Sequence, residues 1–187
     1  IDKRNIEKAD TWLIENGFQT TLISGPTNLE PISGINQINV SSAEEMFNAV
    51  LDCLPTDVAI FSAAVSDFKI KNKEKYKIKK KESMELKLEK NIDILNHISK
   101  HNSLRPKMVI GFAAETNNLN KHAKKKLSEK NCDWIIANDV SDSTIGFASD
   151  FNEVSIFYKN KEYEKIPKMK KSLLADNIVK KVISYLN

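Results

Sequence analysis

Short apolar runs alternate along this chain with segments in which apolar residues recur every three or four positions. The short runs are typical of buried strands, and the longer periodic segments are typical of helices that bury one side. We expect strands at Thr20–Ser24, Gln37–Val40, Asp57–Ala64, Met108–Ala114, Asp133–Ala137 and Val154–Tyr158. We expect helices at Asn5–Asn16, Ala43–Leu54, Asn91–His101, Asn117–Lys130 and Lys170–Leu186. This alternation predicts an α/β fold with a doubly wound, mostly parallel sheet that carries helices on both faces.

The segment between the third and fourth predicted strands has a different pattern. Lysine occupies every second position from Lys69 to Lys81, and Met84, Leu86 and Leu88 then alternate with charged residues. A period of two places alternate side chains on one side of a strand, so a lysine-rich β-hairpin arm is predicted at about 68–90. One interpretation is an edge strand that lysine protects from aggregation. The other is a basic arm that contacts a polyphosphate.

Composition limits the classes of protein that fit. A length of 187 residues indicates a single domain covering residues 1–187, and the formal net charge of +4 is too small for a dedicated nucleic-acid binder. No apolar run approaches the roughly 18 residues of a membrane span. The two cysteines, Cys53 and Cys132, are far apart and form no CxxC pair, which favours a reducing, cytoplasmic location. The three histidines have no metal-binding spacing, so no metal site is predicted in the protein itself.

Polar or small residues follow three of the predicted strands. They form the segments Ser62–Asp67, Gly111–Thr116 and Ala137–Ser141. Ligands of open parallel sheets bind at the carboxyl ends of the strands, where Asp67 could accept hydrogen bonds from ribose hydroxyls. The chain has no GxGxxG, GxxxxGK[ST] or GxSxG segment. This disfavours a simple NAD-dependent dehydrogenase, a P-loop kinase and an α/β-hydrolase.

Two lysines of the fourth predicted helix lie on its apolar side. At about 100° per residue, Lys126 and Lys130 fall within 20° of the stripe formed by Leu119, Ala123 and Leu127. Long lysine stems can cover apolar surface while the ammonium reaches water, and the end of a helix tolerates cations. The alternative is an anion site beneath this helix. The pattern alone leaves both interpretations open.

Seven segments between residues 20 and 160 together resemble one enzyme family. They are TLISGP (21–26), SAAVSDF (62–68), KIKK (77–80), NIDIL (91–95), GFAAETNN (111–118), ANDVS (137–141) and GFASDFNEV (146–154). In this order they resemble the phosphopantothenate–cysteine ligases, also called phosphopantothenoylcysteine synthetases. These enzymes join 4′-phosphopantothenate to L-cysteine through an acyl-nucleotidylate in coenzyme A synthesis. The resemblance implies a modified Rossmann-like sheet.

The resemblance also implies the site residues. Nucleotide binding is expected at Phe61, Ser62, Ala63, Asp67, Lys77, Ile92, Asp93, Ile94, Leu95, Phe112, Lys126 and Lys130. The first three would offer backbone groups to the base, and Lys77 would meet the phosphates and be catalytic, with the arm closing as a lid. We expect both helix lysines to point into a cleft between Ala63 and Phe112, without full carboxylate pairing.

The cofactor and partners follow from the same resemblance. Magnesium is expected with the nucleoside triphosphate, which is CTP by preference, with ATP possible. A homodimer is expected, as is fusion to, or cooperation with, a flavin-dependent phosphopantothenoylcysteine decarboxylase. No nucleic-acid or membrane partner is expected.

The chain departs from the family in two places. Ile92 replaces the usual proline of NPDIL, and the glycine-rich opening strand with its Asn-containing loop is not visible, since only Ile1–Asp10 could replace it. A catalytically impaired nucleotide-binding homologue is therefore one alternative. A basic nucleic-acid-binding module is another, although only Phe68 and Tyr76 lie near the lysines for stacking on bases.

Overall fold

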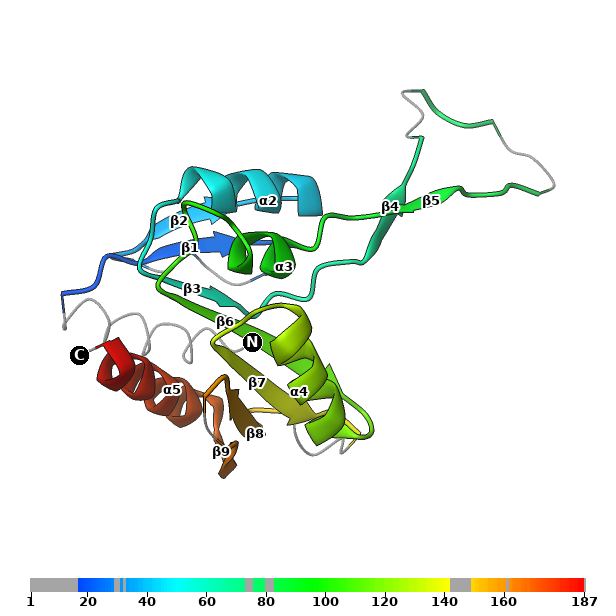
Figure 1. The fold of residues 1–187 in the computed structure, drawn as a ribbon. Helices are drawn as coiled ribbons and strands as arrows, with labels where there is room; N and C mark the ends of the chain where they lie inside the picture. The colour runs from blue at the N-terminus through cyan, green and yellow to red at the C-terminus, as the bar shows by residue number, and fades with distance from the viewer. Residues whose placement is uncertain are drawn as a thin grey trace.

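The fold is an α/β arrangement around one five-stranded sheet (Figure 1). The computed structural model describes residues 17–28, 31, 33–72, 76–79, 83–141, 149–160 and 162–186. The strands are β1 (Thr21–Ser24), β2 (Asn36–Asn39), β3 (Val58–Phe61), β4 (Phe68–Ile70), β5 (Leu88–Lys90), β6 (Met108–Glu115), β7 (Trp134–Asp139), β8 (Phe151–Tyr158) and β9 (Glu164–Lys170). The helices are α2 (Ala43–Asp52), α3 (Ile94–Ser99), α4 (Leu119–Glu129) and α5 (Lys171–Leu186). The predicted helix Asn5–Asn16 lies outside the described residues.

The main sheet has the strand order β3-β6-β7-β8-β9. Strands β3, β6 and β7 are parallel, while β8 and β9 are antiparallel to their neighbours. Strands β1 and β2 form a separate parallel pair. The predicted α/β class is confirmed. Strand β9 was not predicted, because its sequence EKIPKMK contains Pro167 and three lysines and resembles a loop.

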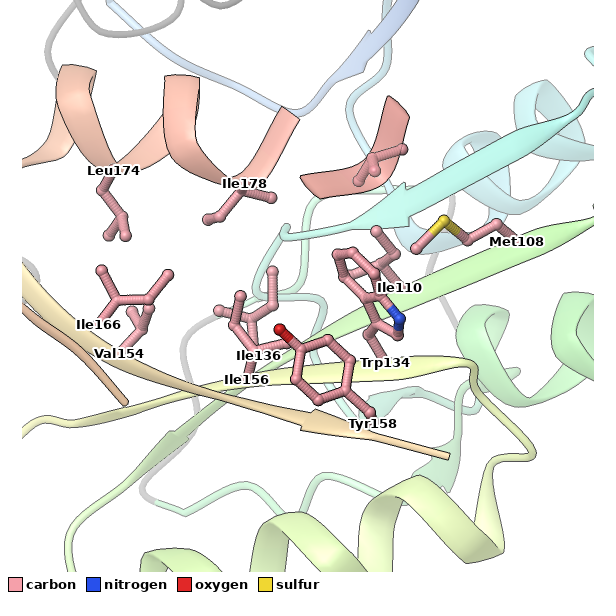
Figure 2. Close-up of a cluster of buried hydrophobic side chains, with 11 residues drawn as sticks. Met108, Ile110, Trp134, Ile136, Val154, Ile156, Tyr158, Ile166, Leu174 and Ile178 are labelled. Carbon is pink, nitrogen blue, oxygen red and sulfur yellow. The ribbon is translucent and has the colours of Figure 1, made fainter. Parts of the chain in front are cut away.

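Helices cover both faces of the main sheet, as predicted. On one face, Leu174, Ile178 and Val182 of α5 pack against a cluster that includes Ile110, Trp134 and Ile156 (Figure 2). On the other face, Ala123 of α4 packs with Val109, Ala113, Ile135 and Phe157. Successive residues of β6 alternate between these two clusters, as strand geometry requires. The core therefore fixes which side chains of β6 can face α4.

Helix α3 packs onto β6 at a glycine. A Cβ placed on Gly111 would lie 2.6 Å from Leu95 Cδ2 and 2.9 Å from Ile135 Cδ1, closer than carbon atoms can approach. Leu95 belongs to α3 and packs against the cluster on the α4 side. The missing side chain at Gly111 therefore allows α3 to lie directly on the sheet.

Helix α2 begins with a serine cap. The Ser42 hydroxyl accepts a hydrogen bond from Glu45 N–H at 3.2 Å. The Glu45 carboxylate also accepts from the N–H of Ser41 at 2.7 Å.

The β4–β5 pair forms the base of the predicted arm. Strands β4 and β5 form an antiparallel pair in which Lys69 lies opposite Glu89 and Ile70 opposite Leu88. The Lys69 ammonium lies 3.6 Å from Glu89 and 3.9 Å from Glu44 of α2. The described residues from 76 to 79 and from 83 to 87 are not in strands, so the period of two does not continue as a strand there. Whether the lysine run forms a hairpin remains a prediction.

An arginine joins the ends of α3 and α4 below the sheet. The Arg105 guanidinium donates to Ser99 O at 2.8 Å, to Asn131 O at 3.1 Å and to the Asp133 carboxylate at 2.8 Å. Asp133 Oδ2 also accepts from Val109 N–H at 2.7 Å. The Ser99 hydroxyl donates to Lys130 O. These bonds hold the carboxyl ends of both helices against the start of β6 and β7.

Replacing Arg105 tests this connection. We expect Arg105→Met to lower the free energy of unfolding by about 2–3 kcal/mol, because the Asp133 carboxylate is only 12% exposed and would lose its cationic partner. Denaturant unfolding of the purified protein measures the change. Lys107→Met is the control, because the Lys107–Asp57 pair is 77% and 71% exposed and should contribute little. Equal effects of the two substitutions would contradict the structural role of Arg105.

Candidate functional site

Three segments predicted to bind nucleotide converge beside the end of β3. They are the loop after β3, the start of α3 and the end of α4. Asn91 joins the first two, since its side chain donates to Ser66 O at 2.8 Å and its N–H donates to Asp67 O at 2.9 Å. This places Asp67 next to the segment that begins α3. Sequence reasoning quoted Asn91 only as part of NIDIL and missed this bridging role.

Asp93 joins α3 to α4. Its carboxylate caps α3 by accepting from Asn96 N–H at 2.9 Å and also forms an ion pair with the Lys130 ammonium. Partial burial favours a higher pKa for Asp93, but it is outweighed by the hydrogen bonds from Lys130 and Asn96 and the charges of Lys130 and Lys126. The pKa of Asp93 therefore lies below its usual value. The carboxylate is charged at neutral pH and holds Lys130 in place.

Lys126 and Lys130 differ in their ion pairing. Lys130 has a carboxylate partner in Asp93, so the prediction that neither lysine is fully paired is wrong for Lys130. The physical reason is that the start of α3, which Leu95 fixes onto β6, brings Asp93 within reach of the end of α4. Lys126 is half-buried and lies near enough to Asp93 to lower its pKa. Within the described residues, Lys126 forms no ion pair.

Phe112 lies on β6 with its side chain turned away from α4. Its side chain packs against the cluster beneath α5, whereas Phe61, Leu95 and α4 lie on the opposite face of the sheet. The Phe112 side chain therefore lies on the face of the sheet opposite to α4. The cause is the alternation of side chains along β6. Phe112 can contribute to a site on the α4 side only through its backbone.

The remaining predicted residues differ in exposure. Ser62 and Ala63 are exposed immediately after β3, and Ile92 is exposed before α3, whereas Ile94 is buried. Lys77 is exposed in the arm and has no ion pair or hydrogen bond with another described residue. A surface hollow of about 500 Å³ lies instead at the far end of α3, and it is lined by Asn96, His97, Lys100, His101, Asn102 and Ser103. None of these six was predicted to bind nucleotide.

A pair of titratable residues lies one turn from Lys126. His122 Nδ1 is 3.0 Å from Glu115 Oε2, and His122, Lys126 and Lys130 follow one another at four-residue intervals on α4. The sequence analysis did not select this pair. The only signal was the same four-residue spacing that singled out the lysines.

The arrangement can bind an anion beside exposed backbone. Lys126 and Lys130 supply positive charge, while Ser62 and Ala63 supply backbone groups at the end of a parallel strand. Asp67 supplies a carboxylate that has no ion-pair partner among the described residues.

No helix in the described part of the chain is long and apolar enough to cross a bilayer.

Comparison with known proteins gives a consistent result. Residues 9–186 match the family model of the DNA/pantothenate metabolism flavoprotein C-terminal domain. The chain is similar to the Coenzyme A biosynthesis bifunctional proteins CoaBC of Haemophilus influenzae (39% identical over 171 residues, 90% of this chain) and Borreliella burgdorferi (41% identical over 171 residues, 89% of this chain). The chain spans 42% of the length of each of these relatives.

A solved structure is similar as well. The crystal structure of the C-terminal domain of a Coenzyme A biosynthesis bifunctional protein CoaBC matches 96% of this chain and 81% of its own, with a TM-score of 0.77 and 31% identity. The family match covers nearly the whole chain, and its motifs are those found in the sequence. The chain therefore belongs to the family of the DNA/pantothenate metabolism flavoprotein C-terminal domain, which confirms the predicted resemblance to the ligase part of the Coenzyme A biosynthesis bifunctional protein.

Proposed function

We propose that this chain is a phosphopantothenate–cysteine ligase that acts through an acyl-nucleotidylate. The observation that carries the proposal is the convergence of Asp67, Asp93, Lys126 and Lys130 beside the end of β3, in a member of a pantothenate-metabolism family. Fusion to, or cooperation with, a flavin-dependent decarboxylase is part of the proposal. It is supported by the bifunctional relatives, of which the chain matches 42%.

The proposed reaction has two steps. A carboxylate oxygen of 4′-phosphopantothenate attacks the α-phosphorus of the nucleoside triphosphate, and pyrophosphate leaves. The amine of cysteine then attacks the acyl carbon, the C–O bond to phosphate breaks and the nucleoside monophosphate leaves as the amine loses a proton. Fixed cations stabilise the negative charge that develops on the phosphates in the first step. Lys77, Lys126 and Lys130 are the residues proposed for this role.

Magnesium fits this site without a dedicated protein cage. Magnesium that enters with a triphosphate needs only one or two protein carboxylates, and Asp67 offers one. When bound, magnesium would neutralise part of the charge on the phosphates. The lysines would then orient the nucleotide.

The two alternatives make different predictions. A nucleic-acid-binding module would lose affinity steeply with added salt and would ignore phosphopantothenate. An impaired homologue would bind nucleotide without releasing pyrophosphate. Pyrophosphate release that requires phosphopantothenate excludes both, and its absence from an intact protein would contradict the ligase proposal.

The first test concerns Lys77. We expect Lys77→Met to lower the rate of phosphopantothenate-dependent pyrophosphate release by at least about a hundredfold, because a cation that acts on the phosphates is lost. We expect its melting temperature to stay unchanged, since Lys77 is exposed. Lys79→Met, two positions along the arm and equally exposed, is the control and should retain activity. If the two variants behave alike, the arm contributes only general charge.

The proposed preference for CTP is tested by measuring phosphopantothenate-dependent pyrophosphate release of the wild type with CTP and with ATP at equal concentration.

The second test separates the two helix lysines. Both Lys126→Met and Lys130→Met should weaken CTP binding, measured by calorimetry, by about tenfold each. Their effects on stability should differ, because only Lys130→Met leaves a partly buried carboxylate without its partner. The lowered pKa of Asp93 gives stability that is present above its unfolded pKa and lost as pH falls through the lower folded pKa. Lys130→Met should therefore flatten the loss of stability below about pH 4, whereas Lys126→Met should change it less. Identical acid unfolding of both variants would contradict this distinction.

We also propose a homodimer. The base of the arm turns its charged side, Lys69 and Glu89, toward α2 and exposes Phe68, Ile70 and Leu88. An isolated two-stranded hairpin with an uncovered apolar side is marginal in water. A second copy of the chain that covers this side supports the arm in both molecules.

Sedimentation analysis of Ile70→Asp combined with Leu88→Asp tests the dimer contact. We expect the double variant to be monomeric at concentrations where the wild type is a dimer, because two charges would be buried in the contact. Leu173→Asp, which changes an equally exposed leucine on α5, should leave the dimer intact. A dimeric double variant would locate the contact elsewhere, and a monomeric wild type would contradict the dimer itself.

A further inference from the structure

Strand β6 places a carboxylate beneath the first turns of α4. Side chains alternate along a strand, so residues 111, 113 and 115 of β6 share one face. Ala113 uses this face to pack with Ala123 of α4. Glu115, two positions further at the carboxyl end of β6, therefore also faces α4. Its carboxylate oxygen Oε2 lies 3.0 Å from Nδ1 of His122.

This contact determines which ring nitrogen of His122 carries a proton. A carboxylate can only accept a hydrogen bond, so Nδ1 must donate to Glu115. In the neutral ring the other nitrogen, Nε2, then has a free electron pair. Among the described residues, Nε2 forms no hydrogen bond or ion pair. Glu115 thus orients a base and leaves its basic nitrogen available to a substrate.

His122 lies on the side of α4 that carries the candidate site. Positions 122, 126 and 130 of the helix form one row, because residues four apart are neighbours at about 5–6 Å. Lys130 at the end of the row meets Asp93, and Lys126 at its centre is half-buried. The row therefore leads from the lysines proposed to bind phosphate to a base near the carboxyl end of β6. The His122 side chain is 41% exposed, so a small molecule can reach it.

The second proposed step needs a proton acceptor. Cysteine attacks through its amine, and its nitrogen carries a surplus proton once it has bonded to the acyl carbon. Lys126 and Lys130 are donors only when charged, and the Asp93 carboxylate is already bound to Lys130. Carboxylates such as that of Asp67 are much weaker bases than imidazole. Within the described part of the site, His122 is the group best suited to take this proton.

We propose that His122 is the general base of the second step and that Glu115 is its positioning residue. This inference rests on the proposed ligase function. As the cysteine nitrogen bonds to the acyl carbon, the C–O bond to phosphate breaks and its electron pair leaves with the nucleoside monophosphate. The surplus proton of the nitrogen passes to His122 Nε2. The Glu115 carboxylate stabilises the imidazolium against the positive charge of Lys126, and the imidazolium then releases the proton to water.

Three variants separate this role from a structural one. In His122→Asn, the side-chain amide can still donate to Glu115, but it has no basic nitrogen. Glu115→Gln keeps an acceptor for Nδ1 and removes the negative charge. Lys125→Met is the control on the same helix, since Lys125 is exposed and forms an ion pair only with Glu129.

The two steps are measured separately in the full-length protein with CTP and phosphopantothenate. A burst of pyrophosphate without cysteine reports the first step. Amide formation after cysteine is added to the bound acyl-nucleotidylate reports the second. Hydroxylamine is then added in place of cysteine. It is a weakly basic amine whose nitrogen gives up its surplus proton readily to water, so its attack on the same intermediate does not depend on a base in the protein.

We expect His122→Asn to keep the pyrophosphate burst and the melting temperature of the wild type. Amide formation with cysteine should be slower by about a hundredfold or more, because a general base contributes this much to a rate. Glu115→Gln should slow the same step by at least about tenfold, since the imidazolium loses its counter-charge. The reaction with hydroxylamine should be unchanged in both variants, and Lys125→Met should leave all three rates unchanged.

Two results would overturn the inference while leaving the ligase proposal standing. One is unchanged amide formation in a folded His122→Asn variant. The other is an equal loss with cysteine and hydroxylamine, which would assign His122 to substrate binding or to the fold. If His122→Asn does not fold, an unchanged rate with cysteine in Glu115→Gln would overturn the inference instead. Absence of the pyrophosphate burst from the wild type would overturn the proposed function itself.

Discussion

The close approach of α3 to β6 at Gly111 is the constraint on which the site depends. Leu95 fills the space beside Gly111, where a Cβ would lie 2.6 Å from Leu95 Cδ2. That contact sets the height of Asp93 above the sheet, and Asp93 in turn meets the end of α4. Arg105 secures the carboxyl ends of the same two helices. Helix α3 is thus held at both ends and α4 at its carboxyl end, and the position of Lys130 follows from packing more than from its own charge.

Much of the fold could be predicted from local patterns. Continuous apolar runs marked β6 and β7, and three-to-four periodicity marked α2, α4 and α5, because a buried strand and an amphipathic helix impose these periods directly. Strand β9 was not predicted from the sequence, because Ile166 is its one buried apolar residue and lysine and proline occupy most of its other positions. The direction of β8 could not be predicted either, since periodicity contains no information about which way a neighbouring strand runs.

The candidate site, like the fold, could be predicted from the sequence only in part. The helical wheel correctly placed Lys126 and Lys130 on one side of α4, because that geometry is local. The partner of Lys130 could not be predicted from the wheel, since Asp93 is 37 residues away in sequence and arrives through tertiary packing. The face to which the Phe112 side chain points could not be predicted from the motif, because a motif gives residue identity and not the parity of a residue along its strand.

Strand β9, at one border of the main sheet, is poorly suited to pairing with a further strand. In β9, Pro167 lacks a backbone donor, and Lys165, Lys168 and Lys170 are exposed along the strand. A further strand approaching this border would meet a proline that has no backbone donor and exposed lysines that it would have to desolvate, of which Lys165 forms an ion pair with Glu153. Within the described part of the chain, these features of β9 oppose the addition of a further strand at this border. Growth of the sheet by intermolecular strand addition, the usual route from a native fold to insoluble aggregates, is opposed at β9 without any cost to the packed core.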